Sequence, residues 1–190
     1  MQDPIKILGV PVHAMTMQEA VKTLEERMLA KEQTFVVTAN AEIIMMCQEN
    51  AEYKKIICED AELVLPDGAG AVWAGRHLGY KVPERVAGFD LYNELLDLSA
   101  HKATRRTSLA VAGVAEAAKA KAEELYPGVQ VVGCHNGYFK DEDVPQIIAD
   151  INASGADMLF VALGAPKQEN GWWHTRGAEH KNSDGHRRQL

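Results

Sequence analysis

One carboxylate stands out for its position. Asp67 lies in "LVLPDGAGAVW", between an apolar run typical of a strand and a small-residue pattern typical of a helix. A carboxylate there would lie at the edge of a sheet where ligands bind, just ahead of a helix whose N–H groups can bind anions. Pro-Asp-Gly is also favoured turn chemistry, so a turn role stays open. We take Asp67 as the candidate catalytic residue.

Three more polar side chains are of types that hold a sugar or a phosphate. Thr38 and Asn40 stand at the end of the apolar run "QTFVVTA" (33–39). Asn40 can cap the following helix or donate to a sugar hydroxyl group. Arg85, in "PERVAG", is either a surface charge or a planar clamp for a diphosphate.

The elements that must position these residues alternate along the chain. Strand-like runs are followed by amphipathic helical patterns, and the helices carry local start and stop signals such as the capping box of Thr16 and Glu19. Continuous apolar strands that alternate with helices indicate a parallel sheet covered on both faces. We therefore predict an α/β fold, a single domain with a Rossmann-like, mostly parallel sheet. The predicted strands are 33–39, 61–66, 107–113, 129–134 and 156–164.

Polar segments follow four of these strands, namely "TANAE", "PDGAG", "HNGYF" and "GAPKQE". Ligands of open parallel sheets bind outside the carboxyl ends of the strands. This distribution favours an enzyme with its site at that edge.

Other chemistries fit less well. Gly68 and Gly70 resemble the start of a dinucleotide loop, but Trp73 occupies the place of its third glycine, which leaves an oxidoreductase as a weaker alternative. Asp141, Glu142 and Asp143 resemble an acidic metal motif, although acidic residues ahead of a helix favour its N-terminal dipole. The sequence contains no HExxH, paired CxxC or phosphate-loop lysine pattern. We predict no metal and no cofactor.

Composition limits the partners and the compartment. The 190 residues carry a formal net charge of −7, which disfavours nucleic acid as a partner. Cys47, Cys58 and Cys134 have no CxxC spacing, a pattern that suits a reduced cytosolic chain. No secretion signal is recognised, and no run reaches the roughly 18 apolar residues of a membrane span. We expect a cytoplasmic chain.

Several segments in one order carry a resemblance to a known family. "FVVTANAEII", "AELVLPDGAGAVWAGRHLG", "VPERVAGFDL", "YPGVQVVGCHNGYF" and "LFVALGAPKQE" resemble the WecG/TagA/CpsF glycosyltransferases over about residues 5 to 169. The resemblance implies a metal-independent, inverting transfer of N-acetylmannosamine or a related sugar from a UDP donor to lipid-linked N-acetylglucosamine. It also implies teichoic acid or surface polysaccharide synthesis at the inner face of the cell membrane.

Carried onto this sequence, the resemblance implies roles for individual residues. Asp67 takes the catalytic-base position, Thr38 and Asn40 lie in the substrate pocket, and Arg85 and Gln168 serve the diphosphate or the acceptor. Tyr138 can stack on uracil or be a core residue. The candidate nucleotide-binding residues are Gly68, Gly113, Gly137, Tyr138, Gly164 and Lys167.

The chain departs from the family pattern at two places. The passage from Gly113 into the next helix is about three residues shorter than usual, close to the expected nucleotide site. The resemblance ends after Glu169, so we predict a catalytic domain at 1–169 and an aberrant or unstructured tail at 170–190. One choice of codons for "KNSDGHRR" gives Lys-Ile-Pro-Met-Ala-Ile-Gly-Val when read one base later, which suggests a frameshift.

The departures leave alternatives for activity and assembly. By the resemblance, family members continue with a buried strand and then a C-terminal tail that contacts the membrane, and both are missing from these residues. The missing strand would expose a sheet edge, which favours self-association. A catalytically impaired nucleotide-sugar-binding remnant is therefore the main alternative function. A homo-oligomer is left open.

Overall fold

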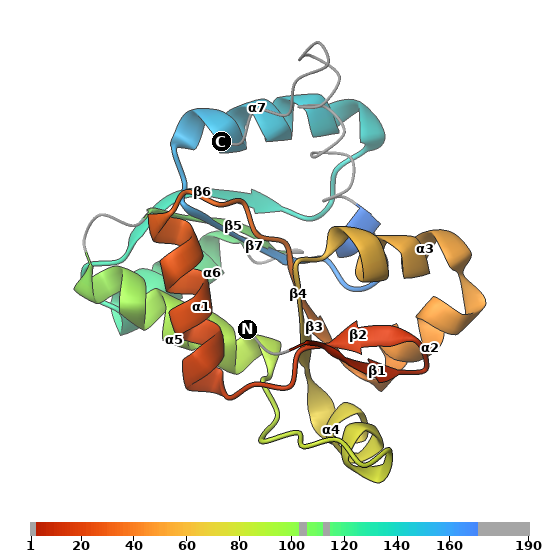
Figure 1. The fold of residues 1–190 in the computed structure, drawn as a ribbon. Coiled ribbons are helices and arrows are strands. Elements are labelled where there is room, and N and C mark those ends of the chain that lie inside the picture. The colour runs from red at the N-terminus through yellow and green to blue at the C-terminus, as the bar shows by residue number, and fades with distance from the viewer. Residues whose placement is uncertain (1–2, 103–105, 112–114, 171–190) are drawn as a thin grey trace. The chain divides into compact units, whose positions relative to one another are not determined.

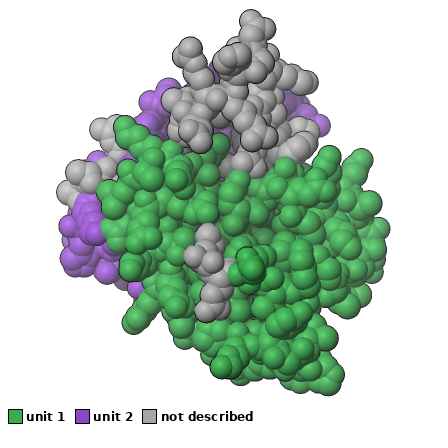
Figure 2. Space-filling view, in the orientation of Figure 1, with its two compact units in different colours: residues 1–91, 169–190 green, residues 92–168 purple. Residues whose placement is uncertain are grey.

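The computed structural model describes residues 3–102, 106–111 and 115–170. The chain divides into two compact units (Figure 2), which are described separately below. Unit 1 comprises residues 1–91 and 169–190, and unit 2 comprises residues 92–168.

Strands and helices alternate through most of the chain, as Figure 1 shows. The strands are β1 (Ile5–Ile7), β2 (Val10–Val12), β3 (Val36–Ala39), β4 (Leu63–Pro66), β5 (Arg106–Val111), β6 (Gln130–Asn136) and β7 (Met158–Ala162). The helices are α1 (Met17–Leu29), α2 (Ala41–Glu49), α3 (Ala51–Lys55), α4 (Gly68–His77), α5 (Gly88–His101), α6 (Ala115–Leu125) and α7 (Val144–Ser154). A π-helical turn, η1 (Ile56–Asp60), continues α3, and a 3-10 turn, η2 (Asp141–Asp143), precedes α7.

Unit 1 is built on two pairs of strands. β1 and β2 form an antiparallel hairpin, and β3 and β4 run parallel from the pair Val36–Leu63 to the pair Ala39–Pro66. The hairpin meets β4 where the backbone N–H of His13 donates to the carbonyl of Val64 at 2.7 Å. All four residues of β4 are buried. A strand that is apolar throughout fits this position because both of its faces are covered.

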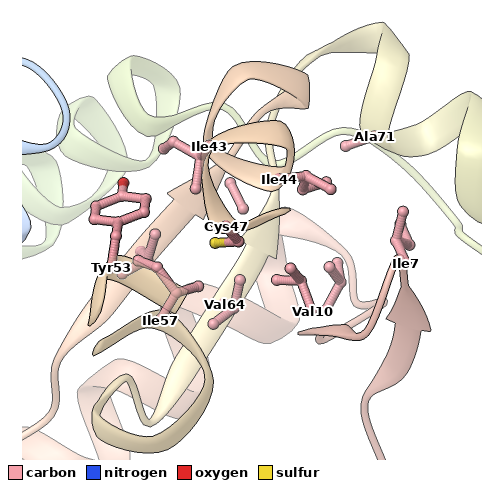
Figure 3. Close-up of a cluster of buried hydrophobic side chains, with 12 residues drawn as sticks. Ile7, Val10, Ile43, Ile44, Cys47, Tyr53, Ile57, Val64 and Ala71 are labelled. Carbon is pink, nitrogen blue, oxygen red and sulfur yellow. The ribbon is translucent and has the colours of Figure 1, made fainter. Parts of the chain in front are cut away.

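A continuous apolar core fills unit 1. Figure 3 shows side chains from β1, β2, β4, α2 and α3 converging, with Cys47 of α2 among them. Ile57 and Val64 are fully buried there, and Cys47 is 1% exposed. Burial of apolar side chains contributes about 1.5–3 kcal/mol each, so this cluster is a main source of stability for unit 1.

Local sequence signals set the helix ends. Thr16 and Glu19 form the predicted capping box of α1, with Glu19 N–H donating to Thr16 Oγ1 at 3.2 Å. The Asn50 side chain accepts from Tyr53 N–H at 3.0 Å and begins α3. Gly79, with φ of +85°, follows the end of α4 in the left-handed conformation that glycine tolerates.

Unit 2 contains a three-stranded parallel sheet in the order β6–β5–β7. Leu96 of α5 and Ala122 of α6 form a small core with Val129 and Val131 near the start of β6. β7 is covered less completely than β4, since Met158 is its one buried residue. The apolar run 156–164 is therefore a strand as predicted, but a half-buried one.

The alternation of strands and helices confirms the predicted α/β class. The strands described fall into three hydrogen-bonded sets, β1–β2, β3–β4 and β6–β5–β7. That the two parallel sets form one Rossmann-like sheet stays a prediction. The division into 1–169 and 170–190 also stays a prediction, and residues 171–190 lie outside the described residues.

Candidate functional site

The carboxyl ends of β3 and β4 lie side by side in unit 1. Thr38 is paired with Leu65, and the next pair is Ala39 with Pro66. The backbone N–H of Asp67 then donates to the carbonyl of Ala39 at 2.9 Å, one step beyond the paired residues. The parallel register thus places Thr38, Asn40 and Asp67 at one edge of the pair.

The Asp67 side chain is held by a residue from another part of the chain. Asp67 stands at the N-cap position of α4, but its side chain makes no cap hydrogen bond to that helix. Its Oδ2 atom instead accepts from the backbone N–H of Gly88 at 3.1 Å. The carboxylate is therefore not used to cap its own helix and is tied to the start of α5 instead, while its catalytic role stays a prediction.

Gly88 approaches the same edge closely. A Cβ atom added at Gly88 would lie 2.7 Å from Thr38 Oγ1, closer than real contacts allow. A residue without a side chain is thus required where the start of α5 meets β3. Sequence reasoning did not select Gly88, although its place three residues after Arg85 in "PERVAG" offered a signal.

Asn40 confirms one of its two predicted roles. Its Oδ1 atom accepts from Ile43 N–H at 2.9 Å and so caps α2. A Cβ atom added at Gly68 would lie 3.8 Å from Asn40 Cβ, which places Asn40 against the residue that follows Asp67. The Asn40 amide group can still donate, because the cap uses only its oxygen. Contact with a substrate stays a prediction.

Arg85 lies on the same side of unit 1, in the connection between α4 and α5. Its neighbour Val86 donates its N–H to the carbonyl of Pro66 at 2.8 Å, directly before Asp67. The Arg85 side chain is 53% exposed and pairs with Asp90 at 3.2 Å. The Arg85 guanidinium therefore lies at the surface, while the backbone of the next residue is hydrogen-bonded to the end of β4.

Unit 2 brings together a second group of candidates. Lys167 Nζ donates to the carbonyl of Gly137 at 2.8 Å and lies 4.6 Å from the centre of the Phe139 ring. Gly164 N–H donates to Gln168 Oε1 at 3.2 Å, and this hydrogen bond joins the two ends of the segment 164–168. The loops after β6 and β7 thus meet, although β5 lies between these two strands in the sheet.

Two alternatives for unit 2 residues are decided. Tyr138 is 82% exposed, so the reading of Tyr138 as a core tyrosine is wrong. Asp143 Oδ2 accepts from Lys140 N–H at 2.9 Å, which supports a capping role for this acidic segment. Gly113 and the shortened loop around it lie outside the described residues.

A buried titratable group was not foreseen from the sequence. Glu169, the last residue of "GAPKQE", is 2% exposed and belongs to unit 1. Burial is the main cause that raises the pKa of the Tyr53 hydroxyl group, and the negative charge of Glu169 is the second. Burial also raises the pKa of the Cys47 thiol to about 11. Cys47 is therefore a core residue in its neutral form rather than a reactive thiolate.

Other features of the described residues lie apart from these candidates. A hollow of about 900 Å³ in unit 1 is lined by residues that include Thr16, Arg76 and Val82, and by none of the candidate site residues. In the part of the chain that the structure describes, no group of three or more His, Cys, Asp or Glu residues is placed to hold a metal ion. No helix among the described residues is long and apolar enough to cross a membrane.

Comparison with known proteins identifies a family. The chain matches the model of the glycosyl transferase WecG/TagA/CpsF family over residues 5–183. This range includes all the candidate residues of both units and continues past Glu169, where the resemblance was expected to end.

Three curated relatives carry the name N-acetylglucosaminyldiphosphoundecaprenol N-acetyl-beta-D-mannosaminyltransferase. The protein from Bacillus spizizenii is 36% identical over 137 residues, which cover 71% of this chain and 52% of the relative. The protein from Bacillus subtilis is 32% identical over 136 residues, or 70% and 52% of the two chains. The protein from Staphylococcus aureus is 32% identical over 170 residues, or 87% and 65%. The matched region thus spans from about half to two thirds of the length of these relatives.

Proposed function

Because this chain belongs to the WecG/TagA/CpsF glycosyltransferase family, we propose that it transfers N-acetylmannosamine, or a related sugar, from a UDP-sugar to lipid-linked N-acetylglucosamine. The names of the curated relatives support the acceptor and the sugar. The observation that carries the proposal is the hydrogen bonding of the Asp67 carboxylate. This carboxylate makes no hydrogen bond to its own helix and accepts instead from the N–H of Gly88, which lies against Thr38.

Asp67 is the general base of this transfer. One carboxylate oxygen accepts from Gly88, and this bond fixes the plane of the group. The other oxygen takes the proton from the acceptor hydroxyl as that oxygen attacks the anomeric carbon of the donor. The bond from the anomeric carbon to the diphosphate breaks at the same time, and the configuration inverts. General-base catalysis of this kind contributes roughly 10²–10⁴ in rate.

The leaving group is UDP, whose diphosphate gains negative charge as the bond breaks. Arg85 is the cation that we assign to this charge, since an exposed guanidinium can exchange its Asp90 partner for a phosphate. In unit 2, Lys167 and Gln168 belong to the proposed donor or acceptor site, and exposed Tyr138 supplies a ring on which uracil can stack. No metal or cofactor is part of the proposal.

Thr38 and Asn40 position the sugar. Thr38 offers a hydroxyl group at the site edge, and the Asn40 amide offers donors that its capping bond does not use. Gly68, with φ of +85° next to Asn40, lets the backbone approach the substrate closely. The product belongs to teichoic acid or surface polysaccharide synthesis, and the protein acts at the inner face of the cell membrane.

Asp67→Asn tests the base assignment. The amide keeps the size of the side chain and an oxygen for Gly88, but it cannot take a proton. We expect transfer from UDP-N-acetylmannosamine to a soluble diphosphate-linked N-acetylglucosamine analogue to fall about 10²–10⁴-fold, with an unchanged melting temperature and unchanged UDP binding. Asp97→Asn, which removes an exposed carboxylate of α5, is the matched control and should keep full turnover.

Three results would change the proposal. Turnover by Asp67→Asn at the unaltered rate removes Asp67 as the base. UDP binding in calorimetry without transfer by the unaltered chain indicates the impaired, nucleotide-sugar-binding form. Binding of NAD(H) in place of UDP would support an oxidoreductase.

A further inference from the structure

The connection between α4 and α5, residues 78–87, carries Arg85 and has no regular secondary structure after the turn at Gly79. Its residues 80–83 line the hollow of about 900 Å³ described above. Val82 and Val86 of this connection are buried, and hydrogen bonds to other parts of unit 1 also fix its backbone.

Arg76, in the last turn of α4, holds the first half of the connection. Its Nε atom donates to the carbonyl of Val82 at 3.0 Å, and a terminal nitrogen donates to the carbonyl of Pro83 at 3.0 Å. The planar guanidinium can donate to two neighbouring carbonyls at once, which a lysine ammonium cannot do with the same geometry. Val82, held in this way, is 3% exposed.

Glu84 fixes the second half. Its Oε1 atom accepts from the backbone N–H of Met17, the first residue of α1. That N–H has no acceptor within its own helix, and a carboxylate at a helix N-terminus is favoured by the helix dipole. Thr16 and Glu19 already serve neighbouring N–H groups there. Glu84 thus completes the start of α1 from a distant part of the sequence.

The residues after Arg85 are fixed as well. Val86 N–H donates to the carbonyl of Pro66, and Gly88 N–H donates to Asp67. Arg85 therefore stands between two anchored neighbours, Glu84 and Val86. Its own side chain is directed to the surface, where it pairs with Asp90.

We propose that Arg76 and Glu84 are positioning residues that hold the Arg85 backbone in place for the leaving diphosphate. This inference rests on the proposed transfer. The backbone of Arg85 is fixed before substrate arrives, so only its side chain has to reorganise when phosphate replaces Asp90. A cation placed in advance stabilises developing charge with little reorganisation.

The experiment combines Arg76→Gln with Arg85→Gln. If Arg76 acts through Arg85, Arg76→Gln alone lowers kcat/KM about 10- to 100-fold, since a displacement of about 1 Å can have that effect. In the Arg85→Gln background, the same change should alter kcat/KM by less than about twofold, because the residue it positions is already gone. Lys22→Gln, which removes an exposed cation from α1, is the control and keeps full activity.

Glu84 supplies the second variant. Glu84→Gln retains an oxygen that accepts from Met17 and should keep most activity, whereas Glu84→Ala should lose activity in the same way as Arg76→Gln. Glu26→Gln removes an exposed carboxylate of α1 and serves as its control. Trypsin gives a readout independent of turnover, because Lys81 and Arg85 are cleavage sites within the connection. Cleavage after Lys81 should be faster in Arg76→Gln and Glu84→Ala than in the unaltered chain.

The outcomes separate the two proposals. An unaltered chain that neither binds UDP nor transfers sugar overturns the proposed function, and this inference with it. An active chain overturns this inference alone in any of three cases: Arg85→Gln has no effect, the losses from Arg76→Gln and Arg85→Gln multiply, or trypsin cleaves all variants equally slowly.

Discussion

The β3–β4 pair of unit 1 and the β6–β5–β7 sheet of unit 2 are both parallel, and both carry candidate residues at their carboxyl ends. They differ in how firmly those ends are held. Every residue of β4 is buried, whereas β7 has one buried residue. In unit 1, Asp67, Gly88 and Thr38 approach one another closely, while Tyr138 of unit 2 is 82% exposed.

The difference suggests that the two units have different roles in the proposed reaction. A general base must be aligned before the reaction, and its alignment benefits from a buried, rigid support. A surface that binds a nucleotide can adjust as the ligand arrives. Unit 1 has the features of the first kind of site, and unit 2 those of the second.

The largest expected effect tests the contrast in burial directly. Leu65→Ala, in the middle of β4 and 0% exposed, should lower the free energy of unfolding by about 3 kcal/mol, because it leaves a cavity. Leu159→Ala, at a half-buried place in β7, should lower it by about 1 kcal/mol. Urea unfolding followed by circular dichroism measures both. Equal losses of unfolding free energy would show that the side chains of β4 and β7 stabilise the protein to the same extent.

A smaller effect on stability is expected at the edge of the site. Gly88→Ala places a methyl group 2.7 Å from Thr38 Oγ1, and overpacking of this kind costs about 1–3 kcal/mol. It also displaces the N–H that holds Asp67, so we expect transfer to fall more than the loss of folded protein explains. Thermal melting and kcat together give the comparison.

Gly70→Ala is the matched control for that change. Its added Cβ would lie 3.2 Å from Ala41 Cβ, so the neighbouring helix has to move by a few tenths of an ångström. Alanine in place of glycine favours a helix by up to about 1 kcal/mol, which offsets the cost of that movement. Near-neutral stability is therefore expected. Full transfer by Gly88→Ala would contradict a rigid arrangement around Asp67.

The smallest effect is a pH dependence of stability that arises at His13, a half-buried histidine of unit 1. Burial lowers the pKa of His13 from its usual 6.5, and its Nδ1 atom lies 3.1 Å from the N–H of Val64. The folded state therefore favours neutral His13. Its contribution to stability is present above pH 6.5 and is lost as pH falls through the lowered pKa.

His13→Asn should weaken this acid dependence, since the amide can accept from Val64 without titrating. Melting temperatures measured between about pH 5 and pH 8 span the range in which histidine titrates. An acid loss of the same size in His13→Asn would show that another group is responsible.

Much of the fold was predictable because its signals are local. The capping box at Thr16, the Asn40 and Asn50 caps and the glycine after α4 each depend on a few neighbouring residues. The apolar runs gave five of the described strands to within a few residues, but the β1–β2 hairpin was not predicted, because its strands have only three residues each. The extent of burial was not predictable. The apolar runs of β4 and β7 have similar sequences, but all of β4 is buried and only Met158 of β7 is buried.

The candidate site shows the same limit. Asp67, Thr38, Asn40 and Arg85 could be selected because each has a suitable type at a strand end or in a polar connection. Gly88, Arg76 and Glu84 were not selected, because their roles depend on partners that lie elsewhere in the chain or are backbone groups. Buried Glu169 was missed for a similar reason, since a glutamate in a polar loop is expected at the surface.

The sequence by itself determined the α/β class, the family and the set of polar residues at the strand ends, because residue type and spacing are written in the chain. Tertiary structure alone decided that the Asp67 carboxylate bonds to Gly88 rather than to its own helix, and that Arg85 lies between two anchored residues. The physical reason is that these bonds join segments distant in the chain, whose distances are set only once the strands have paired and the core has closed.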